Sequence, residues 1–215
     1  MGAAIFFPFA GAIWLSSART IQKMPALSPF TLPSPPRQDK VRGAVKEMVV
    51  SSLAGKFLIA RPAMVDPFFG RSVILMLQHG AEGAFGLVLN RPAPAKELPF
   101  PIFVGGPCKM DGLLMIHGME EWMEPSDDGL MEVCPGVFLG TSEHFERATE
   151  GGEAAEAKFR VFSGYAGWGP KQLESEMLQD AWIVLPASGE LIFGTPVQEL
   201  WERLAPPTLP QPSLN

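Results

Sequence analysis

Three histidines are the side chains best suited to move protons near neutral pH: His79, His117 and His144. The ordinary pKa of an imidazole lets its charge change between pH 5 and 8. His79 and His117 end short apolar runs that predict strands, but no two histidines have the i, i+4 spacing of a helical metal site. The sequence therefore predicts no metal site and no cofactor. The alternative to a proton-transfer role is a hydrogen-bonded structural role at each histidine.

Three arginines lie at comparable ends of predicted strands: Arg61, Arg71 and Arg91, with Asn90 directly before the last. If the fold gathers these ends, the guanidinium groups form a cationic site suited to a carboxylate or a phosphate group. Each arginine could equally pair with a neighbouring acidic side chain. Both interpretations fit the sequence.

Residues 164–170 form a glycine-rich segment, Gly-Tyr-Ala-Gly-Trp-Gly-Pro, that leads into a predicted helix. Backbone N–H groups in such a segment can hold a phosphate. Its spacing matches neither standard nucleotide loop, and Pro170 removes one donor. The favoured interpretation is a sharp strand-to-helix turn under which Tyr165 and Trp168 pack.

No motif for a nucleophilic active site is present in the sequence. There is no Gly-x-Ser-x-Gly elbow, and Cys108 and Cys134 are 26 positions apart, which matches neither a redox pair nor a zinc knuckle. We expect both cysteines to be small buried hydrophobic residues. A reducing cytoplasm suits them.

Composition changes near Met48. Residues 1–47 carry six basic residues, two acidic residues and six prolines. This composition predicts a disordered, basic, proline-rich head over 1–47. The favoured interpretation is that Met48 is the true first residue, so that the head is not part of the native protein. The alternatives are a real extension and an export signal, although no positive charge precedes the first apolar run. We expect a single domain over 48–205 and a disordered tail over 206–215.

The charge balance argues against direct binding to DNA. The chain after residue 47 carries 11 basic and 21 acidic residues, whereas DNA binding draws on cations that displace counterions. No helix-turn-helix or zinc-finger pattern is visible. No apolar stretch reaches the ~18 residues of a membrane-spanning helix.

Short apolar runs separated by turn signals predict strands. The segments 72–78 and 85–89 form the clearest pair, because two glycines in the connection 79–83 allow a tight hairpin. Several runs are continuously apolar, so we expect both faces of the sheet to be covered. The other predicted strands are 56–60, 102–104, 113–117, 137–139, 158–162 and 181–185.

Three helices are predicted. Thr195 and Gln198 form a capping-box pattern with Pro196 at the first helical position, ahead of an apolar stripe that runs to Leu204. A second helix runs from the Gly169-Pro170 pair to about residue 179, and Thr141 and Ser142 cap a short third one. Strands and helices interleave without a regular repeat, which indicates an irregular α+β domain.

Several longer runs occur in a recognisable order: GKFLIARP (55–62), RSVILMLQH (71–79), FGLVLNRP (85–92), FVGGP (103–107), GYAGWGPKQLESEM (164–177), AWIVLP (181–186) and FGTPVQELWERL (193–204). Together they resemble the YqgE/AlgH family. The resemblance implies a bacterial, cytoplasmic and mostly uncharacterised protein, and some members carry the label of transcriptional regulator. It also implies an α+β fold with a bifurcated, mostly antiparallel sheet wrapped into a pseudo-barrel and a few flanking helices.

Besides regulation by direct DNA binding, which the charge balance argues against, two functional hypotheses follow. The first is a non-enzymatic binding or regulatory module that acts through a protein partner or a small anionic ligand. The second is an enzyme that acts on a small anionic metabolite through His79 or His117 beside Arg71 or Arg91. The candidate ligand-binding residues are Arg71, His79, Asn90, Arg91, His117, Tyr165 and Trp168.

Overall fold

The computed structural model describes residues 52–93, 100–123, 132–150 and 158–206. The predicted head at 1–47 and all but the first residue of the predicted tail at 206–215 lie outside these ranges.

The described strands form two sheets, and all neighbouring strands but one pair are antiparallel. The exception is β5 with β9, which run parallel. The first sheet has the order β10-β3-β2-β1-β11, with β1 at Lys56–Ala60, β2 at Val73–Gly80, β3 at Gly83–Val88, β10 at Ala166–Trp168 and β11 at Trp182–Pro186. The second has the order β4-β5-β9-β6-β8-β7, with β4 at Pro92–Ala93, β5 at Ile102–Val104, β6 at Leu114–His117, β7 at Glu132–Cys134, β8 at Val137–Leu139 and β9 at Phe159–Ser163.

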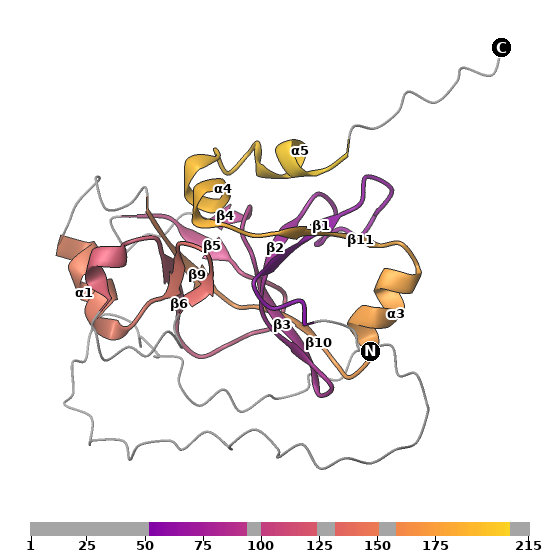
Figure 1. Ribbon diagram of the computed structural model, residues 1–215, viewed down its shortest axis with the longest axis horizontal. Coiled ribbons are helices and arrows are strands. Elements are labelled where there is room, and N and C mark those ends of the chain that lie inside the picture. The colour runs from indigo at the N-terminus through magenta and orange to yellow at the C-terminus, as the bar shows by residue number, and fades with distance from the viewer. Residues whose placement is uncertain (1–51, 94–99, 124–131, 151–157, 207–215) are drawn as a thin grey trace, which may run out of the picture.

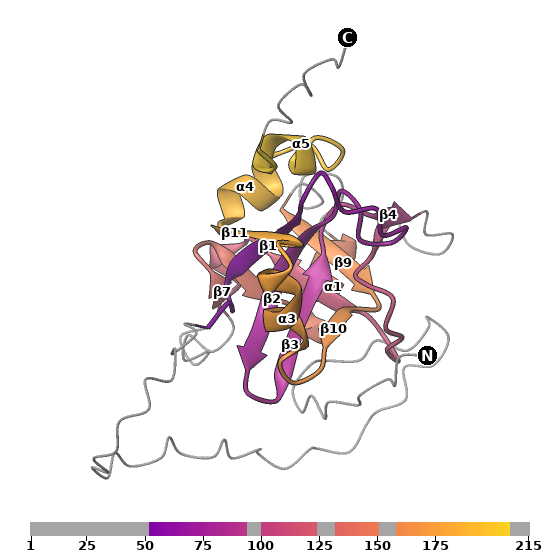
Figure 2. The same ribbon diagram turned by 90° about the vertical axis from the view of Figure 1, so that its right-hand side faces the viewer.

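Helices flank the sheets on opposite sides. They are the 3-10 turn η1 (Glu120–Trp122), α1 (Ser142–Glu150), α3 (Gln172–Leu178), α4 (Gly189–Gly194) and α5 (Leu200–Leu204). Figure 1 shows α1 beside the second sheet, α3 beyond the first sheet, and α4 and α5 together along one edge. Figure 2 shows α3 lying across the first sheet. The predicted α+β class with mostly antiparallel pairing is confirmed, and the described strands form no closed barrel.

Strand β1 shows why the first sheet is buried on both faces. Its alternating residues enter two different cores, because Phe57 and Ile59 pack between the sheets while Leu58 and Ala60 pack under α3. A third core, which includes Met115, lies under α1 on the outer face of the second sheet. The expectation that both faces are covered is therefore confirmed for this part of the sheet.

The predicted hairpin is confirmed. Strands β2 and β3 pair in antiparallel register, and Gly80 lies opposite Gly83 at the turn. Gly83 adopts a φ of 128°, a conformation that favours glycine.

Two of the predicted helices are confirmed near their expected positions. In α1 the Thr141 hydroxyl accepts a hydrogen bond from the backbone N–H of His144 at 3.2 Å, which is the expected N-cap. Helix α3 begins at Gln172, after Lys171 at φ 60°, and it buries Leu173.

The predicted closing helix is wrong at its start. Helix α5 begins at Leu200, and Thr195 instead follows the end of α4 as its C-cap. Helix α4 was not predicted, because its glycine-bounded sequence GELIFG has no apolar stripe long enough to indicate a helix. Its N-cap is Ser188, whose hydroxyl accepts a hydrogen bond from the backbone N–H of Leu191 at 3.4 Å.

The glycine-rich segment 164–170 contains a short strand, so interpreting it as a turn alone is wrong. Residues Ala166–Trp168 form β10, which pairs with β3. Glycines are needed beside it: a Cβ on Gly106 would lie 1.9 Å from the Tyr165 carbonyl carbon, and Gly164 has a φ of 73°.

Cys108 and Cys134 are both free thiols, and Cys134 is buried as expected whereas Cys108 is half-buried. Burial, with a smaller contribution from Glu132, raises the pKa of the Cys134 thiol to about 12. No helix in the described part of the chain is long and apolar enough to span a membrane.

Candidate functional site

Arg71, Asn90 and Arg91 lie together at one end of β2 and β3. The Asn90 side chain accepts a hydrogen bond from the Val73 N–H at 3.0 Å and donates one to the Arg71 carbonyl at 2.8 Å. Arg91 donates to the Gly70 carbonyl at 2.5 Å. Burial and then the charge of Arg71 lower the pKa of the Arg91 guanidinium. These bonds hold the loop before β2 against the residues that follow β3.

Acid pairing is confirmed for two of the three predicted arginines. Arg61 pairs with Asp180 at 2.7 Å, and Arg71 pairs with Glu202 at 2.5 Å. The Arg71 guanidinium also lies 4.4 Å from the centre of the Trp201 ring. Arg71 therefore fastens α5 to the first sheet.

His79 lies at the opposite end of β2 from Arg71. Eight residues of strand place it roughly 25 Å away, at ~3.3 Å per residue. Its side chain is 4% exposed, with Nε2 3.3 Å from a Glu174 carboxylate oxygen. Nδ1 accepts a hydrogen bond from the Leu53 N–H at 3.3 Å.

His117 lies on the second sheet and forms a buried chain of hydrogen bonds with His144. The Met119 N–H donates to His117 Nδ1 at 3.3 Å, so Nε2 of His117 carries the hydrogen and donates to His144 Nδ1 at 3.0 Å. His144 Nε2 then donates to the Trp122 carbonyl at 3.1 Å. His117 accepts at Nδ1 and donates at Nε2 in this chain, so its imidazole is neutral. Burial, reinforced by His144, lowers the pKa of His117 to about 4.

Tyr165 and Trp168 both make packing contacts. The Tyr165 ring lies 5.0 Å from the Phe85 ring, and burial raises the pKa of its phenol. The Trp168 and Trp182 indoles donate to the same Glu176 carboxylate oxygen at 2.9 and 2.8 Å. The seven candidate residues thus share no single site. Arg71, Asn90 and Arg91 come together at one end of β2 and β3, His79 and Trp168 lie on either side of Ala84 at the other end, and His117 lies on the second sheet.

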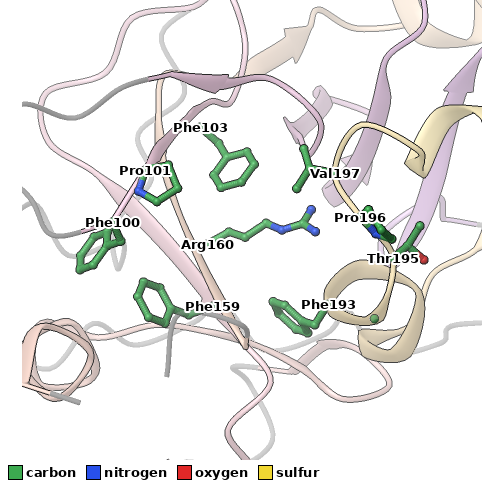
Figure 3. Close-up of a pocket in the computed structure, with 10 residues that line it drawn as sticks. Phe100, Pro101, Phe103, Phe159, Arg160, Phe193, Thr195, Pro196 and Val197 are labelled. Carbon is green, nitrogen blue, oxygen red and sulfur yellow. The ribbon is translucent and has the colours of Figure 1, made fainter. Parts of the chain in front are cut away.

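A pocket of about 410 Å³ opens elsewhere, between the second sheet and the segment that joins α4 to α5. Figure 3 shows the Arg160 side chain crossing the pocket, with Phe103 on one side, Phe159 and Phe193 on the other, and the guanidinium pointing toward Val197. Its remaining lining residues are Phe100, Pro101, Gly194, Thr195 and Pro196. The pocket has the size and the mainly apolar lining typical of small-molecule sites.

Arg160 is the one charged residue among the described residues of this lining, and it is only 6% exposed. One terminal nitrogen donates to the Leu89 carbonyl at 3.1 Å and the other to the Ile192 carbonyl at the end of α4. The guanidinium also lies 5.3 Å from the centre of the Phe103 ring. Burial lowers the pKa of Arg160 to about 10, so it stays charged at neutral pH.

No carboxylate pairs with Arg160 within the described ranges. Its two hydrogen bonds use one N–H on each terminal nitrogen and leave three of its five N–H groups for another acceptor. A buried cation without a counter-charge is costly, so the pocket favours an anion.

The buried histidines stand directly behind this pocket. His117 lies opposite Phe159 in the β6 and β9 register, and a Cβ on Gly118 would lie 3.0 Å from the Phe193 ring. The next residue after His117 therefore has to be small for Phe193 to form a wall of the pocket.

Sequence reasoning missed Arg160 because the run 158–162 was interpreted only as an apolar strand. The signal was present, since a charged residue within FRVFS is rarely fully buried unless it is paired or functional. The pocket also needs α4, which was not predicted.

The AlgH-like family matches residues 57–208 of the chain. A UPF0301 protein of Nitrosospira multiformis is 37% identical over 164 residues, which cover 68% of this chain and 85% of that protein. A UPF0301 protein of Chlorobaculum tepidum is 34% identical over 159 residues, covering 69% and 83%.

Two solved structures are similar in fold. The solution structure of AlgH from Pseudomonas aeruginosa has a TM-score of 0.55 and 28% identity, covering 74% of this chain and 90% of that one. The crystal structure of DIP2367 from Corynebacterium diphtheriae has a TM-score of 0.57 and 22% identity, covering 70% and 84%.

Proposed function

The chain belongs to the AlgH-like family, and from that premise we propose that it is a non-enzymatic binding module that holds a small anionic ligand in the pocket around Arg160. The observation that carries this proposal is the buried guanidinium, which lines an apolar cavity with no carboxylate partner among the described residues.

The position of the pocket supports a regulatory use of the ligand. Its walls come from β5, β9 and the segment between α4 and α5, and Arg160 bonds to α4 and to the residue that follows β3. A ligand bound there contacts both the second sheet and the α4 to α5 segment, so its binding stabilises their packing. Such a change is what a partner protein can sense.

The enzymatic alternative lacks a shared site for its residues. His79 and His117 lie on different sheets, and His79 is at the far end of β2 from Arg71. His117 already uses both ring nitrogens in hydrogen bonds. Nothing in this geometry favours catalysis over binding.

A cytoplasmic location is part of the proposal. It is supported by the two free cysteines, of which buried Cys134 is held as a thiol by its raised pKa. Unpaired thiols persist in a reducing compartment.

Amide NMR tests the proposed site. The protein is titrated with a panel of small carboxylates, phosphates, sulfonates and neutral molecules. We expect at least one anion to shift, saturably, the amides of residues 100–103, 159–161 and 193–197.

A blocking variant and a matched control complete the test. Val197→Trp fills the pocket and should abolish the shifts. Val65→Trp makes the same change at a side chain that is 95% exposed and does not line the pocket, and it should leave the shifts intact. If no panel member shifts these amides, or if the shifts persist in Val197→Trp, the pocket is not the site.

A further inference from the structure

The pocket has one polar end and an otherwise aromatic and aliphatic lining. Apart from Arg160 and Thr195, the described residues of the lining are four phenylalanines, two prolines, a valine and a glycine. The Thr195 hydroxyl is fully buried and has no hydrogen-bond partner among the described residues, so a ligand reaches it only if the wall moves. A matching ligand therefore has one acidic group that binds the Arg160 guanidinium and an apolar body that contacts the remaining lining residues.

The size of the pocket limits this body. The volume of about 410 Å³ lies toward the lower end of the roughly 300–1,000 Å³ found for small-molecule pockets. An aromatic ring or a short alkyl chain together with its polar group fits such a space. A nucleotide carries its polar groups over its whole length, so it does not suit the mainly apolar lining.

The charge of the pocket separates carboxylates from phosphates. Arg160 supplies one positive charge, and no second cation lines the pocket among the residues that the structure describes. A carboxylate balances this charge, whereas a phosphate monoester carries close to two negative charges at pH 7 and leaves one of them buried without a partner. A guanidinium with free N–H groups also matches the two oxygens of a carboxylate.

These observations assign a ligand class to the pocket. Resting on the binding function proposed above, we infer that the pocket selects a small monocarboxylate with an aromatic or short alkyl body, and that Arg160 is the residue that determines this specificity. The carboxylate binds the N–H groups of Arg160 that Leu89 and Ile192 leave free, and the body packs among the phenylalanine rings.

A set of isosteric probes tests the class by calorimetry at pH 7. The probes are 3-phenylpropanoate, its neutral amide 3-phenylpropanamide, 2-phenylethyl phosphate, and acetate as a carboxylate without a body. We expect 3-phenylpropanoate to bind at least about tenfold more tightly than each of the others, since it alone combines one negative charge with an apolar body.

Two variants show which residue sets the preference. Arg160→Lys keeps the charge but loses the planar fork, and it should reduce the preference of the acid over the amide by about tenfold, whereas Arg203→Lys on the exposed face of α5 should leave it unchanged. Amide spectra verify that each variant is folded. If Arg160→Lys does not fold, Val197→Trp provides the test, because it should abolish binding of 3-phenylpropanoate.

The outcomes separate the ligand class from the binding function. An amide that binds as tightly as the acid, or a phosphate that binds more tightly, overturns the monocarboxylate assignment while the pocket remains a binding site. Tighter binding by a peptide with a C-terminal phenylalanine overturns the choice of a small molecule. If none of these probes binds but another member of the NMR panel fills the pocket, the class alone is wrong. If nothing binds the pocket, both the class and the proposed function are wrong.

Discussion

Burial of His117, which outweighs the opposing charge of Glu121, makes the protein sensitive to acid. Its folded-state pKa is about 4, below the ordinary value of 6.5, so the unfolded chain binds a proton more readily than the folded one between these values. Stability is therefore greatest above pH 6.5 and falls as the pH drops toward 4. The full effect of this shift is about 3 kcal/mol.

His117→Gln tests this origin of the acid sensitivity. The free energy of unfolding is measured in urea between pH 7 and pH 4. We expect the variant to be less stable at pH 7 but to have a much flatter pH dependence, because the titrating imidazole is gone. Phe138→Leu, which removes a ring stacked 5.7 Å from His117, should lower stability and keep the wild-type slope. An unchanged slope in His117→Gln would contradict the assignment.

A second prediction concerns the buried Thr195 hydroxyl and its effect on the free energy of unfolding. It has no hydrogen-bond partner among the described residues. Its burial therefore costs desolvation free energy that no hydrogen bond in the folded state offsets. Thr195→Val replaces the hydroxyl with a methyl group of the same shape and should raise the free energy of unfolding by about 1 kcal/mol. A loss of stability on that scale would mean that the hydroxyl makes a bond in solution.

The carboxylate of Glu176 links helix α3 to two tryptophans of the first sheet. Glu176 accepts hydrogen bonds from the Trp168 and Trp182 indoles through one oxygen and from Gln172, at 3.0 Å, through the other. Its removal leaves two partly buried N–H donors without a partner, which costs about 2 kcal/mol.

Hydrogen exchange on a Glu176→Ala variant tests this fastening. The amides of α3 should exchange faster than in the wild type, while those of β6 and β9 in the other sheet should not. Glu146→Ala removes an exposed acid on α1 and serves as the matched control, with a change below about 0.5 kcal/mol. If the α3 amides are equally protected from exchange in both variants, the hydrogen bonds of Glu176 do not hold α3 on the first sheet.

Elements with strong local signals were predictable, and elements set by distant contacts were not. The hairpin of β2 and β3 depends on glycines at a tight connection, and α1 depends on the Thr141 cap. Both elements can therefore be predicted from a few neighbouring residues. Strand β10 pairs with β3, and the end of α4 bonds to Arg160. Neither contact is local in the sequence.

The same difference explains what was predicted of the site. The sequence drew attention to arginines at strand ends, and the structure brings Arg71 and Arg91 together. Arg91 bonds to the loop before β2, whereas Arg71 pairs with Glu202 of the distant helix α5. Arg160 lies inside an apolar strand, and its environment arises only when β5, β9 and the segment after α4 meet. A charged residue in a buried strand is the pattern that would have identified it.

The charge of the whole molecule predicts weak interaction with DNA. The chain carries 17 basic and 23 acidic residues, and the basic excess is confined to residues 1–47. In gel-shift assays with genomic DNA we expect no complex at 50 mM salt. A complex that forms at 50 mM salt and is lost at 200 mM would show direct electrostatic binding and overturn this expectation.

A crystal structure grown with the best-binding anion of the panel shows whether the pocket around Arg160 is the binding site. We expect ligand density between Phe103 and Phe193, with acidic oxygens within hydrogen-bond distance of Arg160. Density at Arg71 and Arg91 instead, with the pocket around Arg160 filled only by solvent, would contradict it.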